Sequence, residues 1–175
     1  MNIIKLCILN IIIPAILVSA TEVNAADPVT LNITGNIVAS PCQISSDSVT
    51  KSIDLGQNIA AATLQSAGSS TSWVNFDINV SNCPSGTTNV TMTMHGTADT
   101  SKPQDTYIST GTAKNVAVEL NSQTGNIQLG NGKTITGTIS NNAYDFKLMA
   151  RMYSSAGNAT PGTVNATVTA TFVYQ

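Results

Sequence analysis

The sequence predicts an all-β protein built as a sandwich of short strands. Apolar and polar residues alternate in many short runs, turn residues separate these runs, and only 9% of the residues are charged. A period of two is typical of strands with one buried face, because successive side chains of a strand point to opposite sides. Many such strands at regular spacing are typical of a β-sandwich.

The first 25 residues are typical of a secretory signal peptide and are not expected to join the fold. Lys5 lies in a short basic start, residues 6–20 are mostly apolar, and Val23-Asn24-Ala25 offers small residues at a cleavage site. The apolar run is short for a membrane span. We therefore expect export, a mature chain that begins at Ala26, and no direct membrane insertion.

Cysteine use predicts one disulfide. Cys7 lies within the signal peptide, which leaves Cys42 and Cys83 in the exported chain. Exported proteins fold in oxidising compartments, so a bridge between these two cysteines is expected. A zinc site is a weak rival, because two cysteines and the single histidine, His95, do not match known ligand spacings.

An alternating, uncharged segment opens the mature chain at residues 28–42. Thr and Asn separate the residues of its apolar face, which are Val29, Leu31, Ile33, Gly35 and Ile37. Gly35 interrupts that face. A glycine inside a strand marks either a bulge or the close approach of a neighbour, and the pattern leaves both readings open.

The middle of the chain predicts a succession of short strands. They are expected at 52–56, 74–80, 89–94, 115–120, 127–129, 134–139 and 144–152, with turn residues between them. Residues 58–66 could form one short helical turn. The polar stretch 97–112 is expected to be a loop with one short strand.

The last fourteen residues form the most regular alternation. They begin at Pro161-Gly162, a turn signal, and one face carries Val164, Ala166, Val168, Ala170, Phe172 and Tyr174. A terminal strand this regular needs a neighbour on each side, or one edge stays open for another chain. The alternative is an ordinary last strand of a complete sandwich.

No pattern predicts catalysis, a cofactor or nucleic-acid binding. Seven Lys and Arg against nine Asp and Glu leave a net charge of −2 and no basic run. The sequence contains no nucleophile-elbow motif that could form a catalytic site with His95. The acidic residues are scattered singly, so no pair is placed for acid–base catalysis. We expect no enzyme, no metal and no cofactor.

Several motifs together resemble the chaperone–usher pilins of the type 1 fimbrial subunit family. They are the amino-terminal segment with Gly35, Ala39-Ser-Pro-Cys42, the run from Ser72 to Pro84, and the closing strand. In that family a glycine stands fourteenth from the carboxyl end and a tyrosine second from it, as Gly162 and Tyr174 do here.

This resemblance implies an incomplete immunoglobulin-like β-sandwich completed by a donor strand from another chain. Residues 26–36 would be the donor-strand extension and 37–175 the pilin domain. The donor positions would be Val29, Leu31, Ile33, Gly35 and Ile37, and the acceptor groove and chaperone contact would comprise Gly162, Val164, Ala166, Val168, Ala170, Phe172 and Tyr174. Insertion of an extended strand beside an open sheet edge is an established mode of recognition.

The implied partners are a periplasmic pilus chaperone, the outer-membrane usher and neighbouring fimbrial subunits, with export through the periplasm to a fimbrium on the cell surface. The resemblance favours a minor tip-fibre subunit, and a major shaft subunit is the alternative. A different class also stays open, namely a self-contained secreted sandwich that binds a ligand, for instance a sugar stacked on Trp73.

Overall fold

The computed structural model describes residues 30–38 and 40–175, and the chain divides into two units, residues 1–36 and 37–175. The expected signal peptide and the first donor position, Val29, lie outside the described residues. In the first unit, residues 30–36 form no strand, and the side chains of Leu31 and Ile33 are 79% and 90% exposed. Within residues 30–36, no packing covers these apolar side chains.

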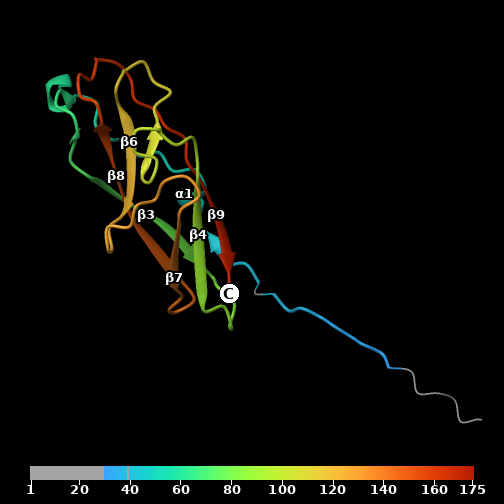
Figure 1. Ribbon diagram of the computed structural model, residues 1–175. Coiled ribbons are helices and arrows are strands. Elements are labelled where there is room, and N and C mark those ends of the chain that lie inside the picture. The colour runs from blue at the N-terminus through green and yellow to red at the C-terminus, as the bar shows by residue number, and fades with distance from the viewer. Residues whose placement is uncertain (1–29, 39) are drawn as a thin grey trace, which may run out of the picture. The chain divides into compact units, whose positions relative to one another are not determined.

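Two antiparallel sheets make up residues 37–175 (Figure 1). The larger has the order β1-β3-β8-β6-β5, with β2 also paired to β8, and the smaller has the order β7-β4-β9. Their strands are β1 (Gln43–Ile44), β2 (Ser69–Ser70), β3 (Val74–Ser81), β4 (Asn89–His95), β5 (Thr106–Ile108), β6 (Ala117–Ser122), β7 (Thr134–Thr138), β8 (Tyr144–Ser154) and β9 (Thr169–Tyr174). The predicted all-β sandwich is confirmed.

Alternating side chains from both sheets form one core. Val80, Phe146 and Leu148 come from the larger sheet, and Val90, Met92 and Met94 come from the smaller one, all at most 2% exposed. Opposite faces of the same strands carry polar residues, which is the pattern that a two-layer β-protein needs.

A close contact joins the two sheets at the edge strand β7. A Cβ atom on Gly137 of β7 would lie 2.2 Å from the ring of Tyr144 in β8. Only glycine leaves room for that ring, and Tyr144 in turn packs edge-on against Phe146 with ring centroids 4.8 Å apart.

Most strands predicted in the middle of the chain are confirmed. The runs at 74–80, 89–94, 115–120, 134–139 and 144–152 correspond to β3, β4, β6, β7 and β8, and the short strand expected within 97–112 is β5. The helical turn expected within 58–66 is the 3₁₀ helix η1 (Ala61–Leu64).

Two predicted strands are wrong. Residues 52–56 form a turn, because Asp54 Oδ1 accepts hydrogen bonds from the Gly56 backbone N–H (2.9 Å) and the Gln57 amide (2.8 Å). Such a side-chain acceptor competes with strand pairing. Residues 127–129 make only an isolated bridge, Asn121 to Gln128.

Three short elements were not predicted, and one of them is β1, which follows the expected segment 28–42. The four-residue helix α1 (Ser46–Val49) and β2 lack any apolar periodicity that would reveal them. Among the described residues, no helix is long and apolar enough to cross a membrane.

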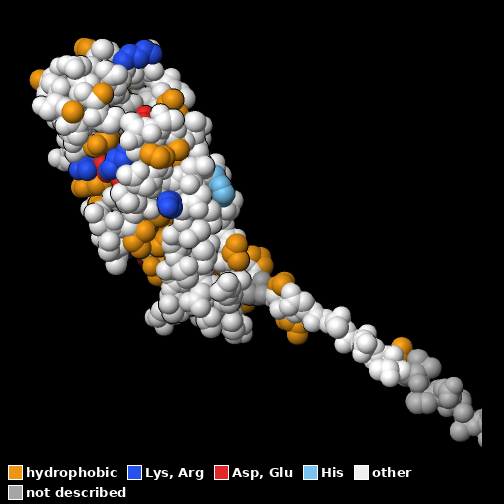
Figure 2. Space-filling view, in the orientation of Figure 1, with side chains coloured by type: hydrophobic (Ala, Val, Ile, Leu, Met, Phe, Trp, Pro, Cys, Tyr) orange, Lys and Arg blue, Asp and Glu red, His pale blue; other side chains and the backbone are white. Residues whose placement is uncertain are grey.

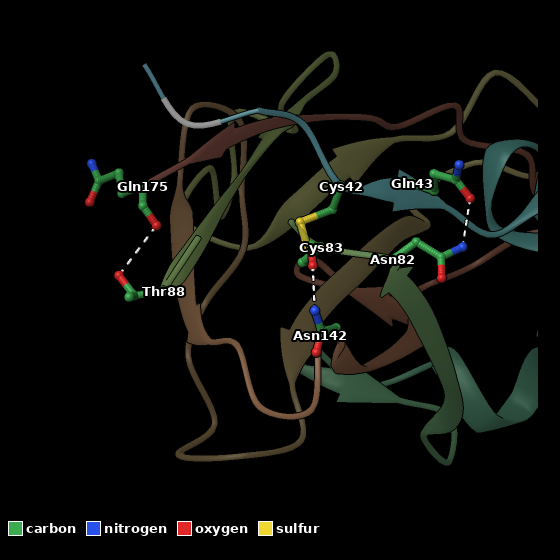
Figure 3. The surroundings of a disulfide bond; sticks show 7 residues. All are labelled: Cys42, Gln43, Asn82, Cys83, Thr88, Asn142 and Gln175. Atoms are coloured by element: carbon green, nitrogen blue, oxygen red, sulfur yellow. Dashed lines mark hydrogen bonds between the residues drawn. A yellow bond between two sulfur atoms is a disulfide. The ribbon is translucent and has the colours of Figure 1, made fainter. Parts of the chain in front are cut away.

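The expected disulfide joins Cys42 to Cys83 and is confirmed (Figure 3). Cys42 directly precedes β1 and Cys83 follows β3, and these two strands pair with each other. Asn142 donates its side-chain N–H to the carbonyl oxygen of Cys83 at 2.7 Å, and Asn82 donates to Gln43 at 2.7 Å. The bridge therefore fastens the start of the second unit to the end of β3.

Replacing both cysteines by alanine should lower the free energy of unfolding by about 4 kcal/mol, because the unfolded chain regains the freedom of a long loop. Thermal unfolding of the double variant, compared with the wild type in the presence and absence of reductant, checks this. Reductant should lower the melting temperature of the wild type alone. Equal melting temperatures for all samples would contradict the stabilising role.

Candidate functional site

The C-terminal strand β9 is an edge strand, paired with β4 on one side only (Figure 1). Asn89 and Gln175 exchange two backbone hydrogen bonds, each 2.9 Å long. In an antiparallel pair, bonded and non-bonded residue pairs alternate. The same alternation therefore turns the backbone groups of Val173 and Thr171 toward β4, and those of Tyr174 and Phe172 away from it.

The free edge extends beyond β9 toward the amino-terminal side. Thr163 and Asn165 use their backbone oxygens to accept bonds from Ala113 (3.1 Å) and Thr110 (2.8 Å). In the described part of the chain, no hydrogen bond reaches the backbone groups of Val164, Ala166 or Val168. The even-numbered residues from 164 to 174 thus present one continuous row of backbone groups on the same open side.

The side chains of these same residues face the core without being fully covered. Ala166, Val168, Ala170, Phe172 and Tyr174 pack against the core cluster and remain partly exposed, and Val164 is also half-buried. The facing residues of β4 differ, since Val90 and Met92 are 0% exposed. An apolar row that is half-covered beside a row of free backbone groups is what a missing strand would leave.

Phe172 is central to this row. Its ring centroid lies 6.0 Å from that of the fully buried Phe146. At the end of the row, burial raises the pKa of the Tyr174 phenol above its ordinary value. The apolar character of the edge therefore persists to the last residues.

A hollow of about 610 Å³ lies at this last end of the row. Tyr174 and Gln175 line it together with the loop 84–87 and with Ile37 and Val38. Ile37 and Val38 are 99% and 75% exposed, so their apolar side chains are uncovered beside the carboxyl end of β9.

Two glycines let the start of the closing segment lie against residues 109–113. A Cβ atom on Gly162 would lie 2.4 Å from the Ala113 backbone nitrogen, and one on Gly111 would lie 1.9 Å from the Thr163 carbonyl oxygen. Gly162 is thus a residue of close backbone approach. The bracing segment 109–113 was not predicted from the alternation, which carries no information on which distant loop pairs with a strand.

The other candidate sites receive less support. His95 is exposed and contacts Thr171 through Nε2 at 3.0 Å, as expected of a rim residue. The guanidinium of Arg151 lies over the Trp73 ring, 4.1 Å from its centroid, so one ring face is taken. Among residues 30–38 and 40–175, no group of three or more His, Cys, Asp or Glu could hold a metal ion.

Taken together, these features define an all-β sandwich with one uncovered strand edge. A family model described as "Fimbrial protein" matches residues 31–175. Protein FimG of Escherichia coli strain K12 is 34% identical over 97% of this chain and 99% of its own length, and the type-1 fimbrial protein A chain of that strain is 29% identical over 99% and 96%. Among solved structures, the P pilus rod subunit PapA covers 78% of this chain and 100% of its own at a TM-score of 0.65 and 23% identity.

The chain belongs to the fimbrial protein family. It is accordingly a structural subunit and not an enzyme, exported through the periplasm to fimbriae on the cell surface. The likeness to PapA supports the immunoglobulin-like sandwich of pilus subunits that the sequence resemblance implied.

Replacing Phe172 by alanine should destabilise the domain by about 2–3 kcal/mol, below the usual cost for a fully buried Phe because the side chain is partly exposed. The matched control is Val173→Ala on the opposite face, where the side chain is 56% exposed and the expected change is within about 0.5 kcal/mol. Chemical denaturation of both variants measures the difference. Equal losses would show that the two faces of β9 do not differ as described.

Proposed function

We propose that this protein is a minor tip-fibre subunit that polymerises by donor-strand exchange and so supports cell adhesion. The open edge formed by residues 164–174 is the observation that carries the proposal. Its free backbone groups would accept the amino-terminal segment of another subunit as an added strand, and this chain's own donor residues 28–37 would enter the groove of a neighbour in the same way.

The two segments complement each other in chemistry. Neither 28–37 nor 162–175 contains a charged residue, and both alternate apolar with small polar side chains. In residues 30–37 the apolar side chains are exposed, with Leu31 at 79% and Ile33 at 90%. Apolar surface left uncovered in the isolated chain is available to a partner groove.

The register of such an exchange would be strongly specified. Val29, Leu31, Ile33, Gly35 and Ile37 would face the groove, whereas a slip of one residue would direct Thr and Asn into it. Burial of these five positions would contribute on the order of 5–10 kcal/mol before the costs of ordering the strand. A joint of this kind would hold under tension chiefly through slow dissociation.

A periplasmic chaperone and the outer-membrane usher are the proposed assembly partners, with neighbouring fimbrial subunits as the final ones. The chaperone would cover residues 162–174 until exchange takes place. Two type-1 A chains of Escherichia coli are 33% and 29% identical to this chain, over 83% and 99% of it, whereas FimG is 34% identical over 97%. This combination of identity and coverage supports the minor tip-fibre subunit. A major shaft subunit is the alternative, and the abundance of the protein in purified fimbriae separates the two.

Supplying the missing strand within the same chain should raise the melting temperature strongly. The test compares two variants of the mature protein that both lack residues 26–36. One carries in addition a copy of residues 28–38 on a short linker after Gln175. The added strand would cover the half-exposed row from Val164 to Tyr174 and occupy its free backbone groups.

The control for this comparison carries Ile33→Asp in the added copy, which would place a charge in the groove and should abolish most of the gain. Differential scanning calorimetry measures all three proteins. Equal and high melting temperatures would mean that the sandwich is already complete, and would favour the self-contained ligand-binding domain instead.

Gly35→Leu should block addition of this subunit to the preceding one and leave its own fold intact. No atom lies within 4 Å of a Cβ placed on Gly35, so the leucine has room in the isolated subunit. Asn36→Leu, which points to the other face, is the matched control and should still add. Native gel electrophoresis of subunit mixtures follows the exchange, and normal addition of Gly35→Leu would refute the assigned register.

A further inference from the structure

A cluster of four charged residues lies where loop 99–105, which precedes β5, meets β6 and β8. Lys102 contacts both Glu119 and Asp105, the latter at 2.9 Å, and Arg151 Nε donates to Glu119 Oε2 at 2.5 Å. The two carboxylate side chains are at most 2% exposed, whereas the cations keep about a quarter of their surface. Charged side chains are sparse on the face shown in Figure 2, and Asp105 and Glu119 are the buried acids among the described residues.

The two acids are not equivalent. Glu119 binds a cation with each of its oxygens. Asp105 uses only Oδ2, which accepts from Lys102 and from the neutral amide of Gln128 (3.3 Å), while its buried Oδ1 has no partner. A buried carboxylate oxygen without a donor is costly, and a proton on Asp105 reduces that cost.

Burial and the neighbouring Glu119 both favour a proton on Asp105. Burial raises the pKa of Asp105, and the adjacent Glu119 carboxylate adds to the rise, against the opposing effect of Lys102. Burial alone would raise the pKa of Glu119 too, but the hydrogen bonds from Arg151 and Lys102 outweigh it and hold that pKa below its ordinary value.

Two aromatic rings complete the surroundings. Tyr153 of β8 lies beneath Lys102, whose Nζ is 4.7 Å from the ring centroid. Tyr107 of β5 donates its hydroxyl to the Leu129 carbonyl oxygen at 2.7 Å, and burial raises its pKa to about 12, so it stays neutral at physiological pH. The protonation of the cluster therefore depends on its two carboxyl groups.

We propose that the Asp105–Glu119 pair is an acid-responsive latch: Asp105, whose buried Oδ1 has no donor, takes up a proton on mild acidification, and the neutral carboxyl removes the incompletely paired buried charge that opposes the attachment of loop 99–105 and β5 to β6 and β8. The attachment is already evident in the backbone, because Leu120 donates to the Asp105 carbonyl oxygen at 2.8 Å and Thr106 is fully buried.

The direction of the effect on stability follows from linkage. Asp105 has a folded pKa above its ordinary 3.8, so stability rises as the pH falls through that raised value. Glu119 has a folded pKa below its ordinary 4.5, so its contribution is present above pH 4.5 and is lost as the pH falls further. Stability should therefore increase on mild acidification and decline only in stronger acid.

This latch lies next to the segment that braces the open edge. Ile108 ends β5, and residues 109–113 follow it directly and pair with Thr163 and Asn165. Under this proposal, a change in the charge of the cluster would therefore reach the strand that leads into this brace, independently of whether the edge accepts a donor strand.

Carboxyl-carbon NMR of the purified wild-type protein tests the latch directly. The Asp105 signal should titrate above pH 3.8 and the Glu119 signal below pH 4.5. The proposal would be overturned if Asp105 titrated below pH 3.8, or if Glu119 titrated at a higher pH than Asp105. This measurement needs no variant.

Thermal unfolding between pH 7.5 and pH 4 provides the second measurement. Asp105→Asn, which resembles the protonated acid, should remove the rise in melting temperature on mild acidification. Asp145→Asn, at a half-exposed position on β8, is the matched control and should keep it. An unchanged rise in the Asp105→Asn protein would show that other groups cause it and would refute the latch.

Discussion

One-sided pairing of the C-terminal strand is the constraint on which the rest of this structure depends. β4 forms hydrogen bonds with the backbone groups of every second residue of β9. Residues 109–113 do the same for the extended segment that precedes β9. The remaining groups point outward from a row of side chains that the core covers only in part. A sandwich of this size could bury that row with one more strand, and its described residues do not supply that strand.

The sequence predicts this much of the fold because the period of two depends only on which side chains are buried. It therefore located β3, β4 and β8, and it placed Phe172 and Tyr174 on the inner face of the last strand. The same periodicity does not reveal side chains that compete with strand pairing for backbone hydrogen bonds. Asp54 is an example, because it accepts a hydrogen bond from the Gly56 amide and the predicted strand becomes a turn. The periodicity also carries no information on which distant segments pair. The bracing segment 109–113 and the extent of β9 could therefore be determined only from the structure.

The few charged side chains are also distributed unevenly over the structure. Only 9% of the residues are charged, and two of the acids, Glu119 and Asp105, are buried beside partly exposed cations. Burying charges costs solvation free energy, and the compensation depends on complete pairing. Glu119 has complete pairing and Asp105 does not, which no count of acids and bases in the sequence could have distinguished.

The absence of charged side chains from residues 28–37 and 162–175 has a consequence for the environment that a fibre of such subunits can tolerate. Dissolved ions weaken interactions between exposed charges, and at 0.1 M salt they largely screen charges more than about 10 Å apart, but they act weakly on backbone hydrogen bonds and buried apolar surface. A joint built from these two segments would hold almost equally well in dilute fluid and in brine. Its strength would follow temperature and mechanical load rather than the ionic strength around the cell.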